Sequence, residues 1–138
     1  MYRRVDAVLE GFAPYAAAPS SAYKESAVLT APPERLVLML YDGIHRFLFQ
    51  ATVAMRDGNP LLTNNKLQRA EAIIDELIAT LDHSAGDISD RLNAIYLYSR
   101  RTLGEARVEK DPAKIEHVQD LIKELRDAWN QICGGAEV

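Results

Sequence analysis

Four stretches of this chain repeat apolar residues at the three- and four-residue spacing of an amphipathic helix, and no segment alternates as a strand would. Only a few residues connect one stretch to the next, so consecutive helices must lie antiparallel. The sequence therefore predicts an all-α protein, an antiparallel up-down-up-down four-helix bundle with a flexible N-terminal leader.

Capping and turn signals set the expected limits of the helices. Thr30 is the predicted N-cap of the first helix, and Asp111 with Pro112 is the predicted start of the fourth. In chain order, the helices are expected over about 30–56, 61–81, 87–106 and 112–132. The predicted organisation is then a mobile leader or cap segment, a bundle domain and a short tail, over 1–29, 30–133 and 134–138.

Each apolar stripe predicts which side of its helix faces the core. We expect the third stripe to point inward from Ile88 onward and the fourth to point inward as far as Ile132. The opposite side of the second helix is charged, and we expect solvent around all of these residues: Lys66, Arg69, Glu71, Asp75 and Glu76.

Composition excludes several classes of function. The net charge of −4 gives no general attraction to nucleic acid or to anionic membranes, and no apolar run is long enough to span a bilayer. The single cysteine, Cys133, cannot form an intrachain disulfide, which suits a reducing compartment. We therefore expect a cytoplasmic protein that neither binds nucleic acid nor inserts into a membrane.

Catalytic and metal-binding patterns are missing from the sequence. A di-iron bundle needs two Glu-x-x-His motifs, whereas this chain has only Asp42-x-x-His45. His83 and His117 lie on other elements without a ligand partner at metal-binding spacing. Cys133 has no histidine nearby in sequence, and the glycines form no phosphate-binding loop. We expect no metal, no cofactor and no enzymatic activity.

Tyrosines and glycines on the helices are the most informative remaining features. Tyr96 and Tyr98 lie about 200° apart on one helix, so both cannot point into the core. Gly104 lies two turns beyond Tyr96, where it either opens a groove beside the ring or permits a tight helix contact. Tyr41 and Gly43 leave the same two interpretations open, an interface or internal packing.

Four passages of the chain resemble the FliS family of flagellar export chaperones. The first two are the segment 22–26, Ala-Tyr-Lys-Glu-Ser, and the stretch 30–43, which ends in Leu-Met-Leu-Tyr-Asp-Gly. The third is the stretch 70–82, and the fourth joins 96–106 to the segment 125–129. Together they cover residues 22 to 132 in the order and spacing of that family, whose fold is a four-helix bundle.

The resemblance implies a bacterial cytosolic chaperone for flagellin. It would bind the disordered C-terminal segment of flagellin about one to one, prevent premature polymerisation and present the subunit for export. The segment would wrap around the bundle and gain helix on contact. The family pattern suggests these residues as candidates for client binding: Tyr23, Tyr41, Ile95, Tyr96, Leu103 and Gly104. Export-apparatus components and regulatory proteins are further partners that the resemblance leaves open.

Two departures from the family pattern bear on the site. The leader before Ala22 is longer than expected, and we expect its apolar residues Val8, Leu9 and Phe12 to cover the client groove. A larger residue is commoner at the position of Gly104, which affects the expected shape of the groove. The alternative function is a non-catalytic bundle that dimerises through Tyr96 and Tyr98 or acts as a regulatory adaptor.

Overall fold

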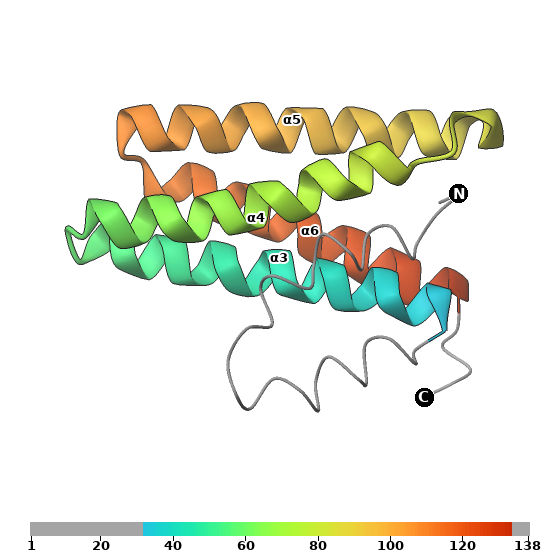
Figure 1. Ribbon diagram of the computed structural model, residues 1–138, viewed down its shortest axis with the longest axis horizontal. Coiled ribbons are helices and arrows are strands. Elements are labelled where there is room, and N and C mark those ends of the chain that lie inside the picture. The colour runs from blue at the N-terminus through green and yellow to red at the C-terminus, as the bar shows by residue number, and fades with distance from the viewer. Residues whose placement is uncertain (1–31, 134–138) are drawn as a thin grey trace.

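A computed structural model of the chain describes residues 32–133. Four long helices occupy nearly all of this range, and a short 3-10 turn, η2 (His83–Ala85), precedes the third (Figure 1). The long helices are α3 (Pro33–Arg56), α4 (Pro60–Thr80), α5 (Asp87–Glu109) and α6 (Pro112–Cys133). The all-α prediction is confirmed.

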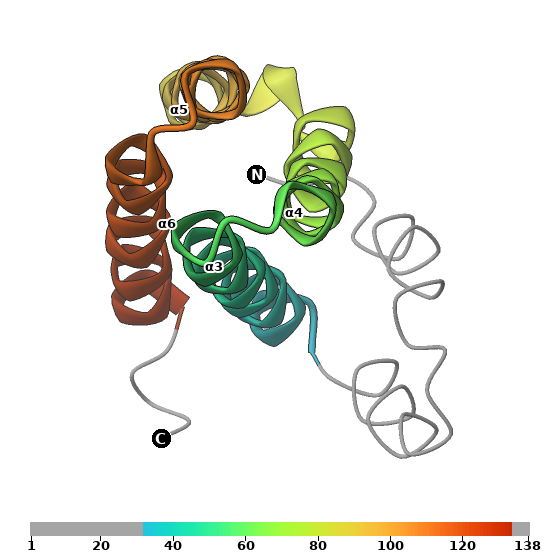
Figure 2. The ribbon, with the colours of Figure 1, turned by 90° about the vertical axis from the view of Figure 1, so that its left-hand side faces the viewer.

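The four helices run up, down, up and down around one core. The α3–α4 and α5–α6 turns lie at the same end of the bundle, and the α4–α5 connection lies at the other (Figure 1). Seen end-on, α3 has α4 on one side and α6 on the other, and α5 closes the ring (Figure 2). The predicted antiparallel bundle is therefore the observed architecture.

The helix ends follow local capping chemistry. Asn59 accepts the Leu62 amide at 3.1 Å to cap α4, and Asp111 accepts the Ala113 amide at 3.0 Å, as its position before Pro112 predicted. The predicted cap Thr30 is wrong for α3, because the N-cap residue is Pro32, which makes no side-chain capping bond. Proline fits this place because the first helical amides need no partner within the helix.

The core is an apolar cluster to which all four helices contribute. In α3 and α4 nearly every residue of the expected stripes is buried, including Ile44, Leu48 and Leu67. Two expectations at helix ends are wrong: Ile88 is 53% exposed and Ile132 is 70% exposed. Both lie in the terminal turn of a helix, where the stripe extends past the last residue that a neighbouring helix can cover.

Several expectations fall outside the described residues. The leader with its apolar residues Val8, Leu9 and Phe12, the segment around Tyr23 and the tail 134–138 all lie beyond residues 32–133. Within that range, no helix has the length and apolar content that crossing a membrane would require.

Candidate functional site

Tyr41 of α3 and Tyr96 of α5 meet in the middle of the bundle. Their hydroxyl oxygens lie 2.6 Å apart, and the two side chains are 1% and 0% exposed. This contact satisfies two phenol groups that would otherwise be costly to bury. It also positions α5 against α3. Tyr41 and Tyr96, predicted as client-binding residues, are therefore core residues in the described structure.

The other described candidates lie on three different sides of α5. Leu103 is fully buried in the core cluster, whereas Ile95 and Gly104 are partly exposed. Ile95 and Gly104 are nine residues apart, which places them on opposite edges of the helix. A Cβ atom added at Gly104 would meet no atom within 4 Å, so this glycine opens space and makes no tight helix contact.

Tyr98 is 40% exposed, which agrees with the prediction that Tyr96 and Tyr98 cannot both point into the core. Its hydroxyl lies 2.9 Å from Nε2 of His117 on α6, and the two rings meet edge to face. Tyr96 is fully buried. The alternative in which both tyrosines form a dimer interface is therefore wrong for Tyr96.

The buried face of α5 is unusually polar. Ser89 and Ser99 are 0% exposed and Thr102 is 6% exposed, in alternation with Leu92 and Leu103. Within the described structure, the hydroxyl oxygens of both serines are buried without a hydrogen-bond partner. Each unpaired hydroxyl weakens the attachment of α5 to its neighbours.

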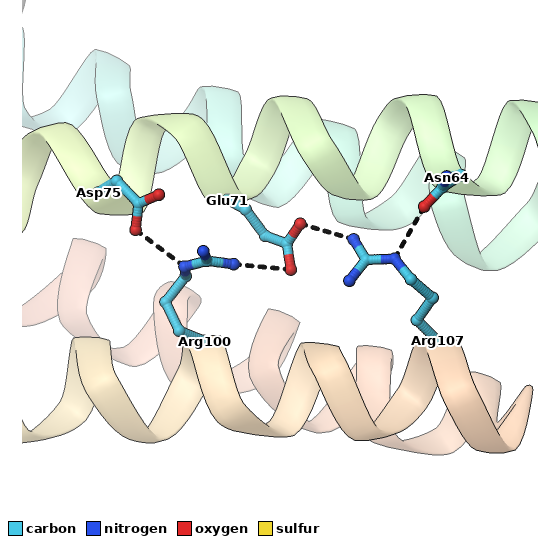
Figure 3. Close-up of polar contacts among 5 residues, drawn as sticks. All are labelled: Asn64, Glu71, Asp75, Arg100 and Arg107. Atoms are coloured by element: carbon cyan, nitrogen blue, oxygen red, sulfur yellow. Dashed lines mark hydrogen bonds and ion pairs between the residues drawn. The ribbon is translucent and has the colours of Figure 1, made fainter.

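Glu71 of α4 is the centre of a charged network that joins α4 to α5 (Figure 3). One oxygen of its carboxylate lies 2.6 Å from Nη2 of Arg107, and the other lies 2.8 Å from Nη1 of Arg100. Nε of Arg100 also donates to Asp75, and Nε of Arg107 donates to Asn64. Long polar side chains thus hold α4 and α5 together along about three turns of α4 and two turns of α5.

The network corrects the expectation that Glu71 is solvated. Glu71 is only 6% exposed, because the two arginine side chains cover it. Arg100 and Arg107 are seven residues apart on one side of α5. That spacing indicates that the two arginines could share a carboxylate on the neighbouring helix. The sequence does not show which carboxylate it is.

Two further cations are held by carboxylates at the edges of α6. Hydrogen bonds to Glu105 and Glu109 raise the pKa of Lys114 above its ordinary value. The hydrogen bond and charge of Glu116 raise the pKa of Arg56 in the same way. Both groups are at the surface, so these pairs orient side chains across helix seams and contribute little to stability.

The described residues contain no group of three potential metal ligands among His, Cys, Asp and Glu. The imidazole of His45 contacts the amide nitrogen of Gln119 at 3.3 Å, His117 contacts Tyr98, and His83 is exposed in η2. These are ordinary surface or seam positions.

The chain is similar to known proteins over most of its length. A family model described as "Flagellar protein FliS" matches residues 15–136. The flagellar secretion chaperone FliS of Bacillus subtilis is 34% identical over 113 residues, which cover 82% of this chain and 84% of that protein. The protein of the same name from Salmonella typhimurium is 36% identical, with 78% and 82% covered, and that of Escherichia coli is 35% identical, with 85% and 90% covered.

Proposed function

Because this chain belongs to the FliS family of flagellar secretion chaperones, we propose that it binds the disordered C-terminal segment of flagellin in the bacterial cytoplasm. Binding is about one to one and non-catalytic, and it keeps flagellin from polymerising before export. The family match over the whole described bundle is the observation that carries this proposal.

We propose further that the client wraps around α5. Among the candidates in the described part of the chain, Ile95 and Gly104 have accessible surface, and they lie on opposite edges of this helix. A single straight groove cannot reach both, whereas a segment that crosses α5 can. Apolar side chains on its outer surface, Leu97 at 52% exposed and Val108 at 81% exposed, would be covered in the complex.

The buried candidates have a supporting role in this proposal. Tyr41, Tyr96 and Leu103 are within the core, so they position α5 and do not touch the client unless the bundle rearranges. A segment that folds on binding must bury a large apolar surface to offset its ordering entropy. The buried contact between Tyr41 and Tyr96 keeps α5 attached to α3 while the outer surface of α5 meets the client.

The first test is calorimetric titration with a flagellin C-terminal peptide of about 50 residues, combined with circular dichroism. We expect one-to-one binding, a negative heat-capacity change and new helix. The titration is repeated after removal of residues 1–20. Because we expect these residues to cover the groove, the apparent affinity for the peptide should be higher without them. Absence of binding in both forms would refute the chaperone function.

Gly104→Trp tests the wrapping geometry. The open space beside Gly104 can hold a side chain without harm to the bundle, but bulk there obstructs a client that crosses α5. We expect the Kd to rise about tenfold, which corresponds to roughly 1.4 kcal/mol. Gln131→Trp, at an exposed neutral position near the end of α6, is the matched control. Equal affinity of both variants would place the client elsewhere.

A further inference from the structure

A cavity of about 580 Å³, the turn-end cavity, lies at the end of the bundle where the α3–α4 and α5–α6 turns meet. Both turns are at the left of the view in Figure 1. The lining includes Met55 from the last turn of α3, Pro60 and Leu61 from the first turn of α4, and Pro112 from the start of α6. Binding sites commonly have volumes of about 300–1,000 Å³, so this cavity is of a size to receive part of a partner molecule.

The apolar part of the lining extends from the core to the surface. Met55 is partly buried and packs against the core cluster. Leu61 is 84% exposed, so its side chain is at the rim of the cavity. A single exposed leucine is ordinary on a protein surface, but at the rim of a cavity it adds to the apolar area that a partner can cover. The flexible side chain of Met55 can adapt to the shape of an apolar group that enters.

The charged part of the lining is basic. Among the described residues, two charged side chains line the cavity, Arg107 and Lys110. Arg107 is already engaged by Glu71 and Asn64 in the network between α4 and α5. Lys110 ends α5 with a φ of 55°, and its ammonium forms no ion pair with another residue between 32 and 133. Apolar surface beside an unpaired ammonium fits an apolar side chain that has a carboxylate next to it.

The outer surface of α5 leads to this cavity. Leu97, Gly104 and Val108 are separated by seven and four residues, so they follow one line along the helix. Val108 is 81% exposed and stands between Arg107 and Lys110 in the chain, both of which line the cavity. A client that covers Leu97 and Val108 therefore reaches the turn-end cavity without leaving the surface of the bundle.

We propose that the turn-end cavity anchors the flagellin segment: an apolar side chain of the segment enters the cavity, and a neighbouring carboxylate of the segment pairs with Lys110. This rests on the proposed function, since the occupant is the client that wraps around α5. A buried apolar anchor gives the wrapped segment one fixed point and so sets its register on α5.

The client fits the cavity better than a second copy of this chain does. Two copies each have a net charge of −4, so they repel one another. A segment that folds on binding can also direct a single side chain into a cavity between two turns, because its own conformation is set only on contact.

The test is a calorimetric titration of the full chain with the flagellin peptide. The cavity variant combines Leu61→Ala with Lys110→Asn, since asparagine tolerates the left-handed conformation. The control combines Ile88→Ala with Lys123→Gln, which makes the same change in net charge. Ile88, like Leu61, is the exposed second residue of a helix, but its helix begins at the opposite end of the bundle.

We expect the Kd to rise about tenfold for the cavity variant and to stay unchanged for the control. In the complex with the unaltered chain, nuclear Overhauser effects should connect an apolar side chain of the peptide to the methyl groups of Met55 and Leu61, and not to those of Ile88. Replacement of the acidic residue beside that side chain by its amide should then weaken binding to the unaltered chain, but not to the single variant Lys110→Asn.

Several results would overturn the proposal. If the unaltered chain binds the peptide and the cavity variant binds it equally well, the cavity has no part in client binding, while the chaperone function stands. Equal losses in the cavity variant and the control have the same meaning. If size-exclusion chromatography shows a dimer of the unaltered chain that the cavity variant cannot form, the cavity holds a second copy. An unaltered chain that does not bind the peptide overturns this proposal and the chaperone function together.

Discussion

Helices α3 and α5 have almost the same length, 24 and 23 residues, but they are held in the bundle by different means. The buried side of α3 is almost continuously apolar and packs against both α4 and α6. The buried side of α5 alternates apolar residues with serine and threonine, and the arginine network of Glu71 bridges it to α4. α3 is the central support of the fold, and α5 is its most weakly packed element.

The difference teaches where a bundle of this kind can accept a partner. Apolar packing is non-directional and strong in sum, so a helix that relies on it cannot adjust without a large loss of stability. Polar bridges of long side chains can lengthen or exchange partners at low cost. We therefore expect client binding to change α5 and its seams, while α3 stays in place.

The largest expected effect is on the α3 side. Leu48 is fully buried in the middle of α3, so Leu48→Ala removes a packed side chain and leaves a cavity. We expect the free energy of unfolding to fall by about 2–5 kcal/mol, measured by urea denaturation followed by circular dichroism. A fall below about 1 kcal/mol would mean that α3 is no better packed than α5.

The bridge between α4 and α5 gives a smaller effect. Glu71→Gln removes the charge shared by Arg100 and Arg107, whose side chains are 36% and 35% exposed. Because water reaches both arginines, we expect a loss of about 2 kcal/mol, less than for a fully buried ion pair.

A triple variant that also converts Arg100 and Arg107 to glutamine sharpens the measurement for Glu71. It leaves neither arginine without its carboxylate, and Asp75, which loses Arg100, is 53% exposed to water, so the variant should recover part of the stability lost in Glu71→Gln. If the three substitutions simply add, Glu71 and the arginines are not one network.

The smallest effect should have opposite signs on the two helices. Ser99→Ala removes a buried hydroxyl of α5 that has no hydrogen-bond partner, so stability should rise by up to about 1 kcal/mol. Thr52→Val on α3 removes a hydroxyl that donates to the carbonyl of Leu48 at 3.0 Å, and stability should fall by about 0.5–1 kcal/mol. Thermal unfolding of the two variants measures both changes in stability. If both variants were more stable than the unaltered chain, the contrast between α3 and α5 would be contradicted.

The fold was largely predictable because helical periodicity and turn chemistry are local signals. Asp57–Pro60 and Asp111–Pro112 placed two turns almost to the residue. The helix start at Thr30 was wrong because α3 begins at Pro33, a residue suited to the first helical position, whereas the capping preference favoured the nearest threonine. The exposed ends at Ile88 and Ile132 were missed because periodicity alone does not show where a neighbouring helix stops.

The site was less predictable because it depends on pairs of residues from different helices. The contact between Tyr41 and Tyr96 joins residues 55 apart in sequence, and nothing local to either indicates the other. Glu71 looked like one more charge on a wet surface, because its burial comes from side chains of α5 and not from its own helix. The family pattern selected mostly residues of α5 but could not separate core positions from surface positions.

The place of α6 in the ring has a consequence for how the protein is made. The indole of Trp129 donates to the backbone oxygen of Glu34 at 2.8 Å, and Arg126 pairs with Asp42 at 3.0 Å, so the last helix closes against the first one described. On the ribosome, α3 and α4 emerge before α6 and can pair as a hairpin, but one flank of α3 stays uncovered until α6 has been made. During synthesis, the apolar flank of α3 that faces α6 is therefore the last to be covered, although α3 is the helix on which the finished bundle most depends.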